Sequence, residues 1–266
     1  MKIVVLMLSL ICAISLSAVE KGLSGELKIA GGTAHIEVYQ TIAKMMMDEN
    51  PDLKITISGG GSGVGIKQVG EGLVDIGNSG RDLKESEITQ YGLVPHKIAI
   101  DGIAVIVNPA SKITNLTMQQ IQDIFLGRVK NWKEIGGDDQ PINIYTRDAN
   151  SGTRQTFEEL ALAKNKVIDE ANFVNSNGNM KVNVGQDEYS IGYVSVGNLD
   201  DKVKAVSIDG IEPNIENVMS GAYKVQRFLY SVTKGEPTGL AKSILDEVLS
   251  AEGQKIVENK GFIRVK

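Results

Sequence analysis

A strand, a glycine-rich loop and a helix are predicted to follow one another in residues 53–71, whose sequence is LKITISGGGSGVGIKQVGE. Leu53, Ile55 and Ile57 alternate with polar residues, as in a half-buried β-strand. The glycines after them permit a tight turn, and Ser62 to Glu71 is predicted to form a helix. In α/β proteins, loops at the carboxyl ends of strands meet at a ligand crevice.

The same strand–loop–helix unit occurs twice more. Residues 26–30 are a predicted strand that leads through Gly31-Gly32-Thr33-Ala34 into a helix over 35–49. Residues 141–146 are a predicted strand that leads through Arg147 to Thr153 into a helix over 151–163. The repeated order of strand, loop and helix predicts the α/β class. Further strands are expected at 73–76, 97–108 (with an interruption at 101–102), 189–196 and 228–233, and further helices from Thr117, whose Thr-Met-Gln-Gln sequence has capping-box form, and over 238–258.

The three loops share the features of an anion-binding site. The first turn of a helix has backbone N–H groups without partners and a partial positive charge, and glycine or a small hydroxyl residue lets an anion approach them. Arg147 adds a planar guanidinium that can bind two oxygens of a phosphate. One such loop alone is most simply a turn with a helix cap. Three of them, one with an arginine, predict a site for a small, multivalent oxyanion.

Composition excludes several classes of protein. The chain has 266 residues, of which 42% are hydrophobic and 23% are charged, so it is not a disordered or fibrous protein. It has 29 Gly but only five Phe and one Trp, so few aromatic side chains are available to stack on bases. The formal net charge of −5 offers no basic surface to nucleic acid or acidic lipid.

The beginning of the sequence predicts export. Lys2 is followed by the apolar run 3–14 and by the small residues of Ser15-Leu16-Ser17-Ala18, which is typical of a secretory signal peptide over residues 1–17. The single cysteine, Cys12, follows the large Ile11, so no lipoprotein signal is recognised. We therefore expect a periplasmic protein that folds without disulfides.

Familiar catalytic and metal motifs do not fit. Ile66 stands where a nucleotide P-loop requires lysine, and His35 and His96 do not have metal-ligand spacing. We expect no metal and no cofactor. Ser151 lacks the preceding glycine of a nucleophile elbow, since Ala149 occupies that position. An exported phosphate-ester hydrolase that uses Ser62 or Ser151 is the alternative. The sequence permits a Ser–His pair through His35, but a histidine at a helix start is more simply a solvent-exposed residue, and there is no carboxylate dyad near the loops. We therefore predict that the protein is not an enzyme.

At these loops the sequence resembles the periplasmic phosphate-binding proteins of ABC importers, in the compact form of that family. The resemblance extends over essentially all of the chain after residue 17. Its most specific parts are the stretch from Arg147 to Thr153 and the pair formed by Phe125-Leu126-Gly127 and Asn131-Trp132. Weaker parts are Gly31-Gly32-Thr33, Gly61-Ser62-Gly63, Val74-Asp75-Ile76-Gly77, Ile191-Gly192-Tyr193-Val194 and Gly253-Gln254-Lys255-Ile256.

The resemblance implies a two-lobed α/β fold of the type II periplasmic-binding-protein class, with two crossover strands near 103–107 and 225–229. Lobe one would comprise residues 18–104 and 228–266, and lobe two residues 105–227. It implies a monomer that captures inorganic phosphate and delivers it to the membrane permease subunits of an ABC importer. A binder of another oxyanion, such as sulfate or molybdate, is the alternative on the same fold.

The resemblance also implies which residues would bind phosphate. Gly80 departs from the pattern, because the family places there an aspartate that accepts the ligand's proton, or a serine. Phosphate would then be distinguished from sulfate only if Asp148 or Asp82 turned inward. Arg81 could instead form a surface ion pair with Asp82 or Glu85. The implied ligand-binding residues are Thr33, Ala34, Ser62, Gly63, Arg81, Arg147, Ser151, Gly152 and Thr153.

Overall fold

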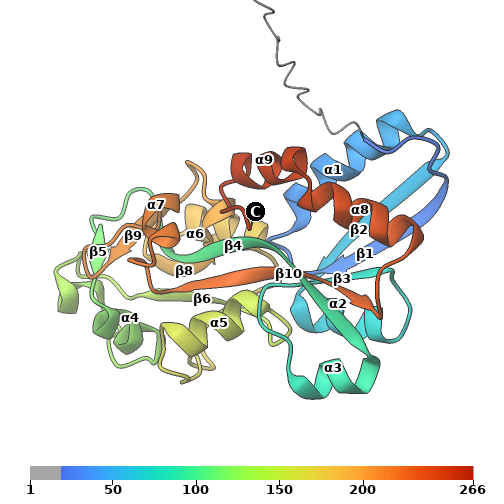
Figure 1. Cartoon of the computed structure of the whole chain (residues 1–266). Coiled ribbons are helices and arrows are strands. Elements are labelled where there is room, and N and C mark those ends of the chain that lie inside the picture. Colours follow the sequence, from blue (N-terminus) through green and yellow to red (C-terminus); the bar gives the residue numbers. More distant parts are fainter. Residues whose placement is uncertain (1–18, 266) are drawn as a thin grey trace, which may run out of the picture.

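The computed structural model of the chain describes residues 19–265, and the predicted signal peptide lies outside this range. The chain forms two lobes, each with a β-sheet flanked by helices, and two long strands run through both (Figure 1). The strands lie in the order β2-β1-β3-β10-β4-β8-β6-β7, with β9 paired to β4 and β5. The predicted two-lobed α/β fold with two crossover strands is confirmed.

Lobe one is built around three parallel strands. β1 (Gly25–Gly31) lies between β2 (Leu53–Gly60) and β3 (Ile76–Ser79). β3 then pairs in the antiparallel direction with β10 (Gln226–Lys234). Helices α1 (Ile36–Glu49), α8 (Gly239–Leu249) and α9 (Ala251–Asn259) lie on one side of this sheet, and α2 (Ser62–Gly70) and α3 (Glu85–Tyr91) lie on the other (Figure 1).

Lobe two is joined to lobe one through the longest strand, β4 (Leu93–Val107). Residues 93–102 of β4 pair with β10, whereas residues 103–107 pair with β8 and β9. The remaining strands of this lobe are β5 (Asn115–Leu116), β6 (Asn143–Arg147), β7 (Asn172–Val174), β8 (Ser190–Ser195) and β9 (Lys204–Ile208). Its α-helices are α4 (Met118–Phe125), α5 (Gly152–Leu160), α6 (Asn177–Gln186) and α7 (Ile215–Met219).

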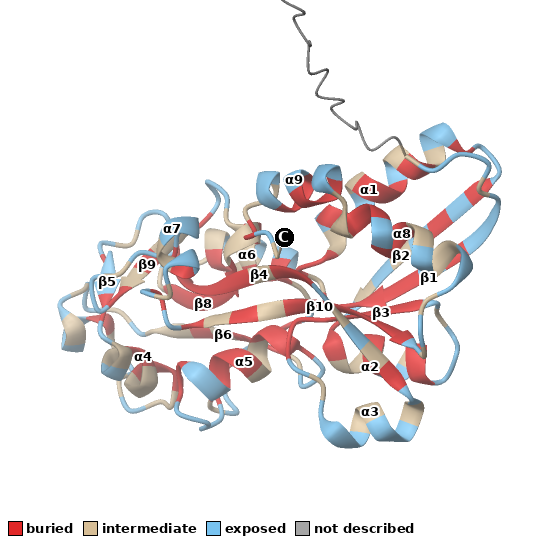
Figure 2. Ribbon diagram, in the orientation of Figure 1, coloured by how far each residue is buried: buried red, intermediate tan, exposed pale blue. Residues whose placement is uncertain are grey.

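Each lobe has its own apolar core, and β4 contributes side chains to both. Ile98 and Ala99 pack in the core of lobe one, while Ile103 and Val105 pack in that of lobe two. The central strands are buried along most of their length (Figure 2). Any relative motion of the lobes must therefore bend the strands between these two sets of residues.

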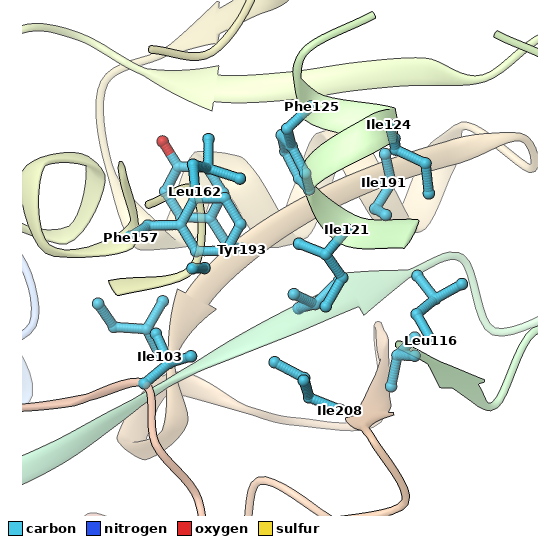
Figure 3. Packing of buried hydrophobic residues seen from close by; sticks show 14 of the residues in the cluster. Ile103, Leu116, Ile121, Ile124, Phe125, Phe157, Leu162, Ile191, Tyr193 and Ile208 are labelled. Atoms are coloured by element: carbon cyan, nitrogen blue, oxygen red, sulfur yellow. The ribbon is translucent and has the colours of Figure 1, made fainter. Parts of the chain in front are cut away.

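Three aromatic rings form the centre of the lobe-two core. Phe157 stacks on Tyr193 with ring centroids 4.1 Å apart, and Phe125 meets Phe157 edge-on at 4.9 Å. Figure 3 shows these rings beside Leu162, with the isoleucines of α4 next to them. This packing holds α5, whose first residues, Gly152 and Thr153, are the end of the Arg147–Thr153 loop.

A buried ion pair joins the two crossover strands where they pass between the lobes. Asp101 of β4 lies opposite Arg227 of β10, and its Oδ2 accepts hydrogen bonds from Arg227 Nε at 3.0 Å and Nη2 at 2.8 Å. Asp101 Oδ1 accepts from Ser195 Oγ at 2.8 Å. Burial raises the pKa of Asp101, and the guanidinium of Arg227 opposes this shift. The expected interruption of the strand at 101–102 is wrong, because the buried charge is paired and β4 continues through it.

The remaining predicted helices and strands agree with the structure in part. The capping box at α4 is confirmed, since Thr117 Oγ1 accepts from the Gln120 backbone N–H and Gln120 Oε1 accepts from that of Thr117. The strand expected at 73–76 was misplaced and occurs at 76–79. Helices α3, α6 and α7 and the short strands β5, β7 and β9 were not predicted. The helix expected over 238–258 is two helices, α8 and α9, which are separated at Ser250.

We predict that Phe125→Ala strongly destabilises the fold. Phe125 is fully buried, and its removal leaves a cavity beside Phe157 and Tyr193, which should cost about 3–5 kcal/mol of unfolding free energy. Urea unfolding followed by circular dichroism measures this loss. Leu73→Ala is the control, because Leu73 is 60% exposed and its loss should be nearly neutral. Equal stability of the two variants would contradict this view of the core.

Candidate anion-binding site

Residues from three strand-to-helix junctions enclose one small cavity between the lobes. The junctions are β1 to α1, β2 to α2, and β6 to α5. The cavity is small, with room only for a small ligand. It is lined by Gly32, Thr33, Ala34, His35, Gly61, Ser62, Gly80, Arg147, Ser151, Gly152, Thr153 and Arg227.

Three hydroxyl groups at the cavity have their acceptor side engaged by protein N–H groups. Ser62 Oγ accepts from the backbone N–H of Gly80 at 2.9 Å, and Ser151 Oγ accepts from that of Arg154 at 3.2 Å as the cap of α5. Thr33 Oγ1 accepts from both the backbone N–H and the side-chain amide of Asn177. A hydroxyl has one proton to donate. Each of these groups therefore retains that proton for an acceptor in the cavity, which is what a bound anion supplies.

Arg147 is the principal charge at the cavity. It is 1% exposed, and its Nη2 donates to the carbonyl of Asn175 at 3.1 Å. Its Nε and Nη1 are buried and have no hydrogen-bond partner among residues 19–265. Burial lowers the pKa of Arg147, yet an arginine remains protonated in proteins. A buried cation with two unpaired donors is costly unless an anion binds it.

The backbone of Arg147 is fixed from two sides. The Tyr193 hydroxyl accepts from the backbone N–H of Arg147 at 3.3 Å and is hydrogen-bonded to Thr146 Oγ1 at 2.7 Å. Arg154 Nη1 donates to the Arg147 carbonyl at 2.8 Å, and Arg154 Nε is paired with Glu158 at 2.7 Å. The aromatic core of lobe two and the first turns of α5 together hold the backbone of Arg147 in position.

Arg227 is a second arginine at the cavity, and sequence reasoning missed it. Besides its pair with Asp101, it donates from Nη1 to the carbonyl of Gly80 at 2.8 Å. A Cβ added at Gly80 would lie 2.8 Å from Arg227 Nη1. The absence of a side chain at residue 80 thus makes room for this guanidinium. The available signal was Arg227 itself, a charged residue inside the predicted crossover strand 225–229, together with Asp101 in the apolar strand predicted over 97–108.

Two of the nine predicted residues do not line the cavity. The guanidinium of Arg81 binds Glu87 in a bidentate pair, at 2.9 and 2.7 Å, and lines a separate, larger hollow with Lys84 and Phe228. Neither Asp82 nor Glu85 is its ion-pair partner. The backbone N–H of Gly63 donates to the Asn150 carbonyl at 3.0 Å. The other seven predicted residues lie together at the cavity.

No acidic residue occurs among the described residues that line the cavity. Asp82 accepts a hydrogen bond from the hydroxyl of Tyr230 at 2.6 Å, and Asp148 accepts from the backbone N–H of Asn150 at 2.9 Å. Neither turns inward. The described portion of the chain also contains no group of three or more His, Cys, Asp or Glu residues arranged to hold a metal ion.

His35, expected to be exposed to solvent at the start of its helix, is instead a buried neutral group in the cavity wall. It is fully buried, and burial lowers the pKa of its imidazole from the usual 6.5 to about 3, with the charge of Arg227 acting in the same direction. Neither ring nitrogen has a hydrogen-bond partner among the described residues. His35 and Ser151 are therefore not hydrogen-bonded to each other, and the pairing that a serine nucleophile needs is not formed.

The two lobes are in close contact around the cavity. A Cβ added at Gly152 would lie 2.9 Å from the Gly80 carbonyl carbon, and one added at Gly61 would lie 2.7 Å from the Asn150 carbonyl oxygen. Thr156 Oγ1 also lies 3.4 Å from the carbonyl oxygen of Gly80. These glycines allow the helix N-termini of opposite lobes to approach one another, and the structure is the closed arrangement of the lobes.

This fold and cavity define a two-lobed ligand-binding protein, and comparison with known proteins agrees. A family model described as PBP superfamily domain matches residues 17–252. The phosphate-binding protein PstS of Bacillus subtilis is 41% identical over 249 residues, which cover 92% of this chain and 83% of that protein. The PstS of Borreliella burgdorferi is 32% identical, with coverage of 90% and 89%. The chain belongs to this family of phosphate-binding proteins within the PBP superfamily.

Solved structures show the same similarity. A phosphate ABC transporter substrate-binding protein from Clostridium perfringens, with bound phosphate, is 40% identical and superimposes with a TM-score of 0.86, covering 91% of this chain and 100% of that one. A phosphate transport receptor from Vibrio cholerae is 32% identical with a TM-score of 0.72, covering 89% and 99%.

In the range 19–265, no helix is both long and apolar enough to span a bilayer.

The buried neutral imidazole of His35 predicts a specific loss of stability in acid. Below pH 6.5 the unfolded chain binds a proton at His35, which the folded chain does not bind until the pH approaches 3. Stability from this residue is thus fully present above pH 6.5 and is lost as the pH falls toward 3, by up to about 1.4 kcal/mol per pH unit. Urea unfolding of the wild type and of His35→Leu between pH 7.5 and 4.5 measures the difference in slope.

The matched control for this prediction is His96→Gln. His96 is partly exposed, and its pKa is lowered less than that of His35, so its removal should change the slope less. Identical pH dependence of the wild type and His35→Leu would contradict the buried, neutral state of His35.

Proposed function

We propose that this protein captures inorganic phosphate outside the cytoplasm and delivers it to the membrane permease of an ABC importer. The observation that carries the proposal is the buried guanidinium of Arg147, whose Nε and Nη1 have no partner in the described part of the chain, in a cavity that also presents three hydroxyl donors. The relatives named phosphate-binding proteins, and the Clostridium perfringens structure with bound phosphate, support phosphate as the ligand.

The proposed ligand contacts come from both lobes. Lobe one contributes Thr33, Ala34 and Ser62, and lobe two contributes Arg147 and the start of α5 with Ser151, Gly152 and Thr153. Hydroxyl groups and first-turn backbone amides donate hydrogen bonds to a tetrahedral anion, and the guanidinium adds a charge-assisted pair. The net charge of the chain is −5, but surface carboxylates are screened beyond roughly 8 Å at physiological salt, so the local donors decide binding.

We propose lobe one as residues 18–104 with 228–266 and lobe two as residues 105–227. The change of core partners along β4, between Ala99 and Ile103, supports a hinge there. An anion held by both lobes would favour the closed form, and closure would present a distinct surface to permease subunits. We propose a monomer whose two lobes both line the cavity, and we propose that the signal peptide expected over residues 1–17 exports it.

The hydrolase alternative has less support. A serine nucleophile needs a base within hydrogen-bonding distance, and Ser62 and Ser151 accept instead from backbone N–H groups of Gly80 and Arg154. We therefore propose a binding protein without catalytic activity. Turnover of p-nitrophenyl phosphate that is abolished by Ser151→Ala would favour the enzyme instead.

Calorimetric titration of refolded, ligand-stripped protein with phosphate, arsenate, sulfate and molybdate tests the proposal. We expect saturable 1:1 binding of phosphate. Arg147→Ala should weaken it by at least about 2 kcal/mol, roughly 30-fold, because it removes a charge-assisted pair inside a closed site. Arg128→Ala is the matched control, since this arginine lies at the surface and binds Asp123. Full affinity in Arg147→Ala would refute its role, and binding of sulfate but not phosphate would refute the ligand.

A further inference from the structure

The segment Asn175-Ser176-Asn177, which precedes and opens α6, holds ligand-binding groups of both lobes. The carbonyl of Asn175 accepts from Arg147 Nη2 at 3.1 Å. Ser176 caps the helix, with its Oγ accepting from the backbone N–H of Asn179 at 3.0 Å. The segment is therefore fixed in place by the arginine on one side and by its helix on the other.

Asn177 is a buried amide that reaches across to lobe one. It is 1% exposed, although asparagine is usually found at the surface. Its backbone N–H and Nδ2 lie 3.4 and 3.3 Å from Thr33 Oγ1, and its Oδ1 lies 3.5 Å from the backbone nitrogen of Ser195. Burying an amide is costly unless it is hydrogen-bonded. Both the backbone N–H and the Nδ2 amide of Asn177 donate to the hydroxyl oxygen of Thr33.

This contact determines how Thr33 can bind a ligand. A threonine hydroxyl donates one proton and can at the same time accept hydrogen bonds at two lone pairs. With two donors from Asn177 on its acceptor side, the Thr33 proton is directed away from Asn177, and Thr33 lines the cavity. The arrangement exists only when the lobes are closed, because Asn177 belongs to lobe two and Thr33 to lobe one.

We propose that Asn177 is a positioning residue for the anion: it orients the Thr33 hydroxyl as a donor and makes that donor available only in the closed form. The inference rests on the proposed binding of phosphate. Asn177 itself does not line the cavity, so it acts through Thr33 and not by contact with the ligand.

A double-mutant cycle with phosphate as the titrant tests this role. Asn177→Ala should weaken phosphate binding about tenfold in the wild-type background but by less than twofold in Thr33→Val, which has no hydroxyl to orient. Asn177→Asp should be worse than Asn177→Ala, because a carboxylate would accept the Thr33 proton and turn it from the anion. A purely structural role would make the nearly isosteric aspartate the milder change. Val182→Ala, at an exposed position of α6, should bind as the wild type.

Three outcomes overturn the proposal. They are unchanged affinity in Asn177→Ala, an equal loss in the Thr33→Val background, or better binding by Asn177→Asp than by Asn177→Ala. In each of these the wild type still binds phosphate, so the proposed function stands, whereas a wild type that binds no phosphate overturns both. Thermal unfolding checks that each variant is folded. If Asn177→Ala does not fold, Asn177→Ser replaces it in the same cycle, because serine also lacks the amide.

Discussion

The burial of one incompletely paired guanidinium is the constraint on which the site depends. Arg147 is held at its backbone by the Tyr193 hydroxyl and by Arg154, and at its Nη2 by the Asn175 carbonyl, while Nε and Nη1 remain without partners among the described residues. The groups that hold it belong to the core and the helices of lobe two. Packing of the lobe thus keeps this cation and its N–H donors out of water. In that environment of low dielectric constant, their attraction for an anion is strongest.

The second requirement is that the lobes approach one another without side chains between them. Gly61, Gly80 and Gly152 provide this, since a Cβ at each would lie within 3 Å of an atom of the other lobe or of Arg227. The hydroxyls of Ser62 and Thr33 are engaged at this same interface, by Gly80 and Asn177. The contact between the lobes therefore also orients the hydroxyl donors. A small anion bound by these donors would link lobe one to lobe two.

The local parts of the site could be predicted from the sequence, and the parts made by distant pairing could not. Each strand-to-helix loop is contiguous, so the three loops could be found from the order of strand, glycine-rich turn and helix. The resemblance to the family implied Thr33, Ser62 and Ser151 within them, and the structure brings these residues together. Arg227 and Asp101 are 126 residues apart and meet only because β10 and β4 pair. Arg81 was misassigned because nothing in the spacing indicated that α3 would bring Glu87 to it. α6 was missed because its Asn- and Gly-rich sequence favours a helix poorly, yet Ser176 caps it and Met180 and Val184 bury one face.

The position of a bound tetrahedral anion tests the account most directly. Anomalous diffraction from crystals grown with arsenate locates the anion's central atom without reference to any assigned contact. The account predicts a single strong peak in the cavity. It should lie where the arsenate oxygens can hydrogen-bond to Ser62 and Thr33 on one side and to Arg147 and Ser151 on the other. A peak in the hollow lined by Arg81 and Lys84, or no peak in a crystal whose protein binds arsenate in solution, would contradict it.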